Sequence, residues 1–383
     1  MPEGFALYVH VPWCRHVCPY CDFNVYAHAA PPEADYTAML VRELATWTEL
    51  APWRGRRVAS IFFGGGTPSL FTPDAIARVV DAAARCCGIE DGAEITLEAN
   101  PGGLDAERLR GFRRAGVTRL SLGVQSFQPH LLRSLGRDHT PDDARAAARD
   151  ARAAGFEDLS LDLIFAVPGS DEVQWSHDLD EAVALAPDHV SAYALTFESA
   201  TPYHAWRASG RIRAVDEDVE VAMAELAADR LPAAGYERYE ISSWARPDHA
   251  SRHNQRYWDG SWYLGIGAGA HAFDATPGAA RRWSNVRHPR AYADAVAARG
   301  TGVAEEHPLT VNEARADFAF TGLRRIAGVD ASAFAARFGV GLADAFPHVA
   351  GLVRDDLLEW TGDRLRLTVR GLRFADTVAA TFV

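Results

Sequence analysis

The chain has 383 residues, of which 48% are hydrophobic, 23% charged and 10% aromatic. These are the proportions of a globular protein, and they exclude a disordered or collagen-like chain. The 39 basic and 51 acidic residues give a net charge of −12, which argues against general binding to nucleic acid, because that needs a basic surface. At roughly 150 residues per domain, the length indicates two or three domains, or one large α/β barrel with an appendage.

The N-terminal sequence MPEGFALYVHVPWC has no basic segment followed by an apolar run, so we expect no signal peptide. The sequence contains no apolar stretch of about 18 residues, so we predict no membrane span. Five cysteines in a long chain without a secretion signal favour metal binding or catalysis over a disulfide framework. We therefore expect a cytoplasmic protein that does not span a membrane and does not bind nucleic acid.

The first two-thirds of the chain alternate between short apolar runs and amphipathic stretches. Six strands are predicted at Ala6 to Val11, Val58 to Phe63, Glu94 to Glu98, Arg119 to Gly123, Leu159 to Phe165 and His189 to Leu195. Helical patterns lie between them: one has Tyr36, Leu40, Leu44 and Trp47 on one face, one starts at Thr72-Pro73-Asp74, and others lie near 105–115, 141–154 and 174–185. Repeated strand–helix alternation predicts a parallel sheet, closed into a partial (β/α)6 barrel. A doubly wound sheet is the competing topology.

The pattern changes after about residue 200. A helix is predicted near 217–234, followed by an aromatic segment and the glycine run Gly265 to Gly269. Helices near 312–326, 331–338 and 342–360, a strand pair from Leu358 to Leu367 and a last helix then predict a small winged-helix-like domain. We therefore divide the chain into a barrel domain (1–235), a linking segment (236–305) and a C-terminal, mainly helical domain (306–383).

Three cysteines follow the first predicted strand with the spacing C-x3-C-x2-C: Cys14, Cys18 and Cys21. Three thiolates on one loop can hold an iron–sulfur cluster, which normally takes four, so one iron is left open for another ligand. The alternative is structural zinc with His16 or Asp22 as the fourth ligand. The neighbouring Cys86 and Cys87 point in different directions on a predicted helix, so we interpret them as packing residues.

Polar or glycine residues follow the other predicted strands at the end where parallel α/β folds carry their chemistry. These are the run Gly64, Gly65, Gly66 and Thr67, then Glu98, Gln125 and Asp162. A single buried Gln or Asp is usually a satisfied core residue, but several at equivalent strand ends, beside the cysteine loop, indicate one site.

The cysteine loop, with an aromatic residue before its last cysteine, resembles the radical S-adenosylmethionine (SAM) superfamily. That resemblance implies a [4Fe–4S] cluster on Cys14, Cys18 and Cys21, with SAM chelating the fourth iron. It implies that Gly64, Gly65, Gly66 and Thr67 receive the SAM amino group, and that Tyr8, Tyr20, Glu98, Gln125, Arg137 and Asp162 surround SAM. Arg137 would pair with the SAM carboxylate, its alternative role being a surface helix-cap arginine.

Within the superfamily, the chain resembles the heme chaperone family HemW, long labelled a putative oxygen-independent coproporphyrinogen III oxidase. The resemblance rests on YVHVPWC, CPYCDFN, FFGGGTPSL, EANP, SLGVQSF, LGRDH, DLIFAVPG, HVSAYALTFESATP, YERYEISSWA, SRHNQRYW and GIGAGAHAF. The anaerobic coproporphyrinogen dehydrogenase has a fourth cysteine at the position of Phe23 and a long extension before the cluster. Two positions depart from the family pattern, Trp244 in place of Asn and Ala166-Val167 in place of Gly-Leu.

The segment His253 to Trp258 resembles the HNxxYW motif that the family links to heme. An imidazole (His253) or a phenolate (Tyr257) can ligate heme iron, with His271 as a weaker candidate. The alternative is an aromatic cluster around a satisfied histidine. The resemblance thus implies a heme carrier that passes heme to an acceptor hemoprotein, a membrane hemoprotein being one candidate. The alternatives are an enzyme that decarboxylates coproporphyrinogen propionates, and SAM cleavage used only to gate heme release.

Overall fold

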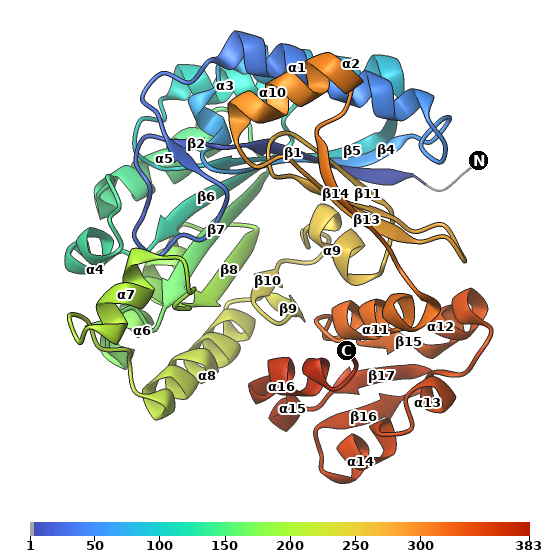
Figure 1. Ribbon diagram of the computed structural model, residues 1–383. Coiled ribbons are helices and arrows are strands. Elements are labelled where there is room, and N and C mark those ends of the chain that lie inside the picture. Colours follow the sequence, from blue (N-terminus) through green and yellow to red (C-terminus); the bar gives the residue numbers. More distant parts are fainter. Residues whose placement is uncertain (1–3) are drawn as a thin grey trace.

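Six parallel strands form the centre of the computed structural model, which describes residues 4–383 (Figure 1). They are β1 (Phe5–Val11), β4 (Val58–Gly65), β5 (Ile89–Ala99), β6 (Arg119–Gln125), β7 (Asp158–Phe165) and β8 (His189–Ala194). They lie side by side in chain order, and each neighbouring pair is parallel. In a doubly wound sheet the order of the strands reverses at a switch point. These six strands keep their chain order across the sheet, which confirms the partial (β/α)6 barrel.

Helices cover the outer face of these strands (Figure 1). They are α1 (Glu33–Glu49), α2 (Pro73–Cys86), α3 (Ala106–Arg114), α4 (Pro129–Ser134), α5 (Pro141–Ala153), α6 (Glu172–Ala184) and α8 (Glu217–Ala233). Two of them begin where the sequence signals a start. Thr72 caps α2 by accepting from the N–H of Ala75, and Thr140 and Asp143 form a capping box at α5.

The linking segment extends the sheet at both edges to twelve strands. At one edge β9 (Glu237–Glu240) and β10 (Ser243–Ala245) continue from β8; at the other, β11 (Tyr263–Ile266) pairs parallel with β1 and leads to β12 (His271–Asp274), β13 (Arg281–Asn285) and β14 (Val303–Pro308). The helices α9 (Arg252–Trp258) and α10 (Pro289–Arg299) accompany these strands, whereas α7 (Pro202–Ala208) follows β8 within the barrel domain and packs against α4. Trp262, Leu264, Trp283 and Tyr292 are buried in the same core as the barrel strands, so this segment packs as part of the barrel body. The boundaries at residues 235 and 305 stay predictions, and residues 1–3 of the expected barrel domain lie outside the described residues.

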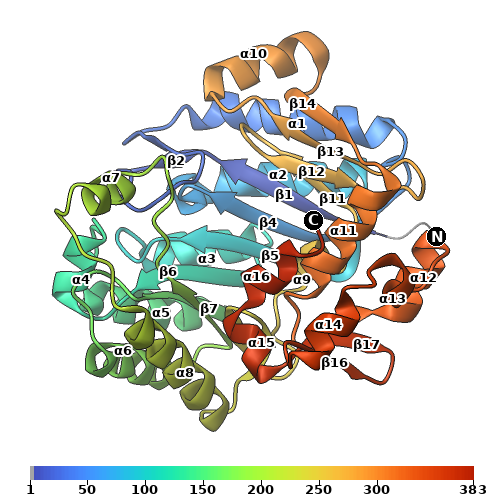
Figure 2. The same cartoon turned by 60° about the horizontal axis from the view of Figure 1, so that its bottom comes forward.

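The C-terminal residues form a separate core of helices and a three-stranded sheet (Figure 2). The elements are α11 (Val311–Gly322), β15 (Val329–Asp330), α12 (Ala331–Phe338), α13 (Leu342–Ala345), α14 (Val349–Arg354), β16 (Leu358–Thr361), β17 (Arg364–Leu367), α15 (Val369–Arg373) and α16 (Ala375–Ala380). The single helix expected over 342–360 is wrong. Pro347 disfavours helical backbone at Phe346, and the chain makes two short helices around that point before entering β16. Likewise, the last helix is two short ones.

No helix within residues 4–383 is long and apolar enough to cross a membrane.

Candidate cluster and SAM site

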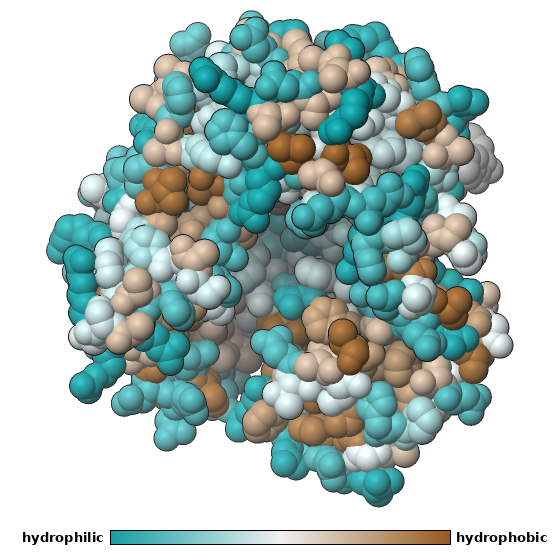
Figure 3. Space-filling model, viewed as in Figure 1, coloured by the Kyte–Doolittle hydropathy of each residue, from teal (hydrophilic) through white to brown (hydrophobic). Residues whose placement is uncertain are grey.

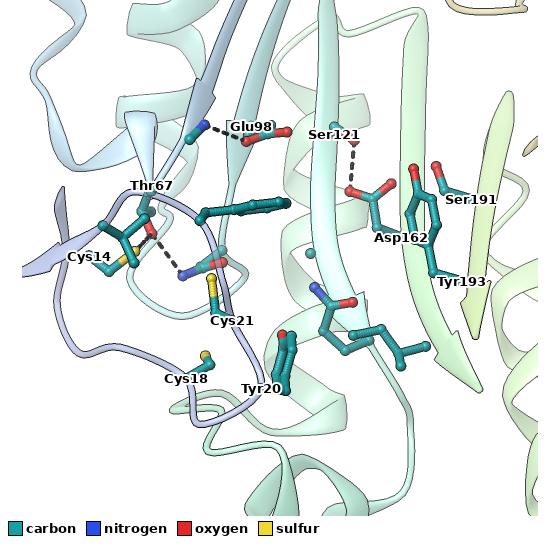
Figure 4. A pocket seen from close by; sticks show the side chains of 18 of the residues that line it. Cys14, Cys18, Tyr20, Cys21, Thr67, Glu98, Ser121, Asp162, Ser191 and Tyr193 are labelled. Carbon is teal, nitrogen blue, oxygen red and sulfur yellow. Dashed lines mark hydrogen bonds between the residues drawn. The ribbon is translucent and has the colours of Figure 1, made fainter. Parts of the chain in front are cut away.

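A cavity of about 580 Å³ opens at the carboxyl ends of the barrel strands. Figure 4 looks into a pocket with the cysteine loop on one side and β6, β7 and β8 on the other. Of the residues predicted to bind cofactors, the cavity is lined by Cys14, Cys18, Tyr20, Cys21, Gly65, Gly66, Thr67, Glu98, Gln125, Arg137 and Asp162. Residues from six different strands or loops therefore converge on one space. Figure 3 shows a hollow in the middle of the face seen there, between the barrel and the C-terminal helices.

The three cysteines lie on the loop between two short strands, β2 (Trp13–Cys14) and β3 (Tyr26–Ala27), which pair with each other. All three thiols are free. Thr67 Oγ1 donates to the sulfur of Cys14 at 3.4 Å, and a guanidinium nitrogen of Arg137 lies 3.6 Å from the sulfur of Cys18. Burial raises the pKa of Cys14, and raises that of Cys21 to about 11. A metal that binds here therefore displaces protons from the thiols.

The three cysteine sulfurs do not have the close mutual spacing of a preformed tetrahedral zinc site. A tetrahedral zinc site with Zn–S bonds of about 2.3 Å would hold its sulfurs roughly 3.8 Å apart. Within residues 4–383, one group of potential ligands lies mutually within 4.8 Å, namely Asp158, Asp188 and His249, and the three cysteines do not form such a group. His16, which with Asp22 was one of two candidates for the fourth ligand of an alternative zinc site, is hydrogen-bonded through Nε2 to the carbonyl of Gly136 at 2.5 Å.

The acidic group of Asp158, Asp188 and His249 has a structural explanation. Arg119 pairs with Asp158 at 2.5 Å, and Arg152 pairs with Asp188 at 2.7 Å. Guanidinium groups thus balance both carboxylates, and nothing in this group requires a cation.

The glycine turn after β4 brings the backbone close to the cysteine loop. A Cβ on Gly66 would lie 2.5 Å from the carbonyl oxygen of Trp13, so no larger residue fits there without movement. The N–H of Gly65 donates to Glu98 at 3.2 Å, and the N–H of Thr67 donates to the carbonyl of Trp13 at 2.8 Å. Turn and cysteine loop are therefore held as one unit.

Two carboxyl groups face the cavity, Glu98 from β5 and Asp162 from β7. Burial, and then the nearby Asp162, raise the pKa of Glu98 to about 8. Burial also raises the pKa of Asp162, although Ser121 donates to it at 2.9 Å and Ser191 opposes the shift. Gln125, at the end of β6, has φ of 66°, a left-handed conformation that is uncommon outside glycine and concentrates at functional sites.

Arg137 is held in place but not saturated. Its Nη2 donates to Asn100 Oδ1 at 2.6 Å and to the carbonyl of Gly123 at 2.9 Å. Its buried Nε has no hydrogen-bond partner within residues 4–383. A buried, unpaired guanidinium donor lining a cavity suits an anionic ligand group. The location also excludes the alternative of a surface helix cap.

The remaining candidates lie outside the lining of this cavity. Tyr8, behind it, donates to Nδ1 of His10 at 3.1 Å, and Gly64 precedes the turn in β4. His253 is fully buried, and its ring nitrogens are hydrogen-bonded to Ser60 at 2.9 Å and Tyr257 at 2.8 Å.

Tyr257 borders a second cavity of about 230 Å³. This cavity lies between the linking segment and the C-terminal domain, and its walls include Trp258, Tyr263, Phe273, Arg282, Phe318 and Arg337. The HNxxYW motif therefore lies between the two cavities: Asn254 lines the cluster and SAM cavity, whereas Tyr257 and Trp258 line the second one. His271 is exposed on β12 and belongs to neither cavity.

Several lining residues were missed from the sequence. Asn100 donates to Thr67 at 3.1 Å and accepts from Arg137, while Ser121, Ser191 and Tyr193 line the wall around Asp162 (Figure 4). Their signal was present: polar residues at every second position of β6, β7 and β8 place one polar face of the sheet toward the barrel interior.

The comparisons with known proteins agree with this geometry. Residues 8–182 match the Radical SAM superfamily, and residues 309–374 match the HemN C-terminal domain. The crystal structure titled "Coproporphyrinogen III oxidase (HemN) from Escherichia coli is a Radical SAM enzyme" superposes with a TM-score of 0.84, covering 99% of this chain and 90% of that one at 22% identity. At that identity the likeness shows a shared fold, and the chain has the fold and cysteine loop of a radical SAM protein.

Curated relatives narrow the class. The Bacillus subtilis protein named heme chaperone HemW is 34% identical over 99% of both chains. The protein of that name from Mycobacterium tuberculosis H37Rv is 37% identical over 100% of this chain and 95% of the relative, and the one from Escherichia coli K12 is 40% identical over 75% of each. The chain belongs to the HemW family of heme chaperones.

The raised pKa of Glu98 predicts a pH-dependent stability of the cluster-free protein. A carboxyl with a pKa of about 8 in the folded chain, and about 4.5 in the unfolded chain, keeps a proton on folding between these values. Its stabilising contribution is therefore complete below about pH 4.5 and is lost as the pH rises to about 8. Between pH 5.5 and 8 we expect the free energy of unfolding of the unmodified protein to fall by on the order of 2 kcal/mol because of this group. The Glu98→Gln variant should not show that fall. Urea unfolding at both pH values measures it, and parallel curves for the two proteins would contradict it.

Proposed function

We propose that this protein is a heme carrier that holds a [4Fe–4S] cluster on Cys14, Cys18 and Cys21, binds SAM in the adjoining cavity, and passes heme to an acceptor hemoprotein. The observation that carries the proposal is the convergence of three free thiols with an unsaturated buried arginine on one cavity. The acceptor is a hemoprotein, with a membrane hemoprotein as one candidate.

The residues around the cavity fit SAM by their chemistry. Arg137 offers its free Nε–H to the SAM carboxylate. The N–H groups of Gly65 and Thr67 are already engaged within the protein, which suits the turn to offer carbonyl oxygens to the SAM amino group. Glu98 and Asp162 offer carboxyl oxygens to ribose hydroxyls, Gln125 and Tyr20 complete the lining, and Tyr8 lies outside it. When bound, the cluster supplies the single electron that cleaves the SAM sulfonium.

Phe23 favours a carrier over a coproporphyrinogen dehydrogenase. It stands where that enzyme has a fourth cysteine, lines the cavity and is 63% exposed. A large apolar ring exposed beside a cofactor site suits contact with an apolar ligand or partner more than metal ligation.

The heme ligands suggested by the HNxxYW motif need a change of contacts. His253 and Tyr257 hydrogen-bond each other, and the imidazole is also bound to Ser60. Burial lowers the pKa of His253 to about 3, so the imidazole is neutral, as a ligand must be. Of the two side chains, Tyr257 borders a cavity with aromatic walls and two arginines, which suit one edge of a porphyrin and its propionates; at about 230 Å³ the cavity would have to widen to admit the whole ring. We therefore place iron ligation at Tyr257, with His253 released only if the pair opens.

We expect Tyr257→Phe to change the absorption spectrum of the heme-loaded protein, because the phenolate is lost while the ring stays. Tyr263→Phe is the matched control. Tyr263 borders the same cavity, and its ring meets that of Tyr257 edge to face, with the ring centroids 4.7 Å apart. Heme titrations of both variants and of His253→Ala give the readout. A Tyr257→Phe spectrum identical to the unmodified protein would place iron ligation elsewhere.

An anaerobic assay tests the function as a whole. The protein with a reconstituted cluster receives SAM, a reductant and coproporphyrinogen III, and mass spectrometry follows vinyl-bearing product. A second sample receives heme and an apo-hemoprotein. The carrier proposal predicts one heme per chain, transfer to the acceptor and no vinyl product. Multiple turnovers to protoporphyrinogen would overturn it in favour of a coproporphyrinogen dehydrogenase.

A further inference from the structure

The far end of the cysteine loop is anchored mainly by the side chain of Asn24, and the hydroxyl of Tyr26 adds a longer contact of 3.4 Å to the carbonyl of Arg287. The loop has few hydrogen bonds of its own in this part, among them Cys21 N–H to Cys18 O at 3.1 Å and Val25 N–H to Phe23 O at 2.8 Å. Near Cys18 it is held from outside by Arg137 and by the contact of His16 with Gly136. Among residues 4–383, no hydrogen bond from outside the loop reaches Cys21, which lies three residues before Asn24.

The Asn24 amide spans two distant segments. Its Nδ2 donates to the carbonyl of Ala268 at 3.0 Å and to the carbonyl of Arg287 at 2.9 Å. Both partners can only accept, so the amide orientation is fixed by its contacts. The backbone carbonyl of Asn24 accepts from His10 Nε2 at 2.9 Å, which ties the same residue to β1.

The glycine run in the linking segment is shaped around this amide. Gly269 has φ of 76°, and a Cβ placed on it would lie 2.4 Å from Nδ2 of Asn24. Glycine is therefore required there both for its backbone conformation and for the close approach of the asparagine.

The receiving segment is itself rigidly held. The hydroxyl of Tyr36 accepts from the N–H of Ala268 at 2.8 Å and donates to the carbonyl of His10 at 2.9 Å. The buried carboxyl of Glu43 accepts from the N–H of Gly267 at 3.0 Å. The residues around the Ala268 carbonyl, which Asn24 binds, are thus held to α1 by Tyr36 and Glu43, and Tyr36 in turn is bound to β1.

We propose that Asn24 is the positioning residue for Cys21 and that the Gly265–Gly269 run serves as its receptor. The linking segment thereby sets the geometry of the cluster site, although it contributes none of the cysteines. This rests on the proposed cluster at Cys14, Cys18 and Cys21.

Asn24→Ala and Gly269→Ala test the proposal from the two sides of the contact. The first removes the amide, and the second places a methyl group where the amide lies. In the cluster-free protein, we expect amide hydrogen exchange over residues 14–27 to accelerate roughly tenfold in each variant, as expected for the loss of one or two hydrogen bonds. In the reconstituted and reduced protein, we expect the change that SAM induces in the electron paramagnetic resonance spectrum to be diminished or lost.

Two matched controls separate positioning from general damage. Gly278 has φ of 74° and nothing within 4 Å of an added Cβ, so Gly278→Ala reports the backbone strain alone. Asn312→Ala removes an exposed asparagine from α11. Both are expected to keep the exchange rates and the SAM response. In the double variant Asn24→Ala with Gly269→Ala, the added methyl enters vacated space, so its effect should be less than the product of the single effects.

The outcomes distinguish this inference from the function on which it rests. A wild-type protein that takes up no cluster would overturn the proposed function. A wild type with a SAM-responsive cluster, but with Asn24→Ala and Gly269→Ala matching the two controls, would overturn the positioning role. Gln in place of Asn24 keeps the donors on a longer arm, and partial rescue by Asn24→Gln relative to Asn24→Ala supports the role.

Discussion

Replacing any one of Cys14, Cys18 and Cys21 with alanine is expected to reduce the iron content of the reconstituted protein from about four atoms per chain to nearly none. The reason is that three thiolates are already fewer than the usual four. With two, the cluster would have two open irons at a cavity mouth that is reached by solvent. Neighbouring groups also favour the thiolate forms of two of these cysteines, since Thr67 donates to Cys14 and Arg137 places positive charge beside Cys18.

The measurement is iron and sulfide analysis with the absorption spectrum after anaerobic reconstitution. Cys86→Ala is the control, because Cys86 is exposed at the end of α2, outside the cavity. We expect it to load like the unmodified protein. A single-cysteine variant that retained a full cluster would show that another side chain completes the site, and Asp22, which lines the same cavity, is the first to test.

Local patterns were enough to predict the barrel. Each of the six strands was placed to within about five residues, because each is a short stretch with apolar residues at least at every second position, followed by a turn. The cysteine loop and the glycine turn were also found, since each is contiguous in sequence. The helix expected over 342–360 failed because the apolar pattern continues across Pro347, where the backbone cannot remain helical.

The contacts that hold the site together could not be predicted, because they join residues far apart in the chain. Asn24 binds Ala268 across 244 positions, and no local pattern links an asparagine after a cysteine motif to a glycine run. The HNxxYW motif shows the reverse difficulty. Its residue types permit iron ligation, and only the fold reveals that His253 is buried with both ring nitrogens occupied.

Glu43 was missed although its signal was visible. It falls on the apolar face of α1 that contains Leu40, Leu44 and Trp47, where a carboxyl group is out of place. A charged residue on such a face is almost always paired. In the fold it lies fully buried, where α1 meets the linking segment.

Replacing Glu43 with alanine is expected to produce the largest loss of stability among these variants, about 4 kcal/mol or more. The carboxyl accepts hydrogen bonds from four groups at 2.7 to 3.0 Å. The donors are the N–H groups of Gly267 and Gly302, the amide of Asn285 and the hydroxyl of Tyr292. Each buried donor left without an acceptor costs about 1–3 kcal/mol. Burial raises the pKa of Glu43, and the hydrogen bonds from these donors oppose that shift.

Urea unfolding of the cluster-free protein measures this loss, with Glu49→Ala as the control, because Glu49 is exposed at the end of the same helix. Glu43→Gln keeps the shape but turns one acceptor into a donor that faces other donors, so we expect a smaller loss of about 2 kcal/mol. Because Glu43 holds Gly267 beside the carbonyl that binds Asn24, both Glu43 variants should also load less iron, in the order of their stability loss. A Glu43→Ala protein as stable as Glu49→Ala would mean that its four donors find water or other acceptors, and that the linking segment is held to α1 by apolar packing alone.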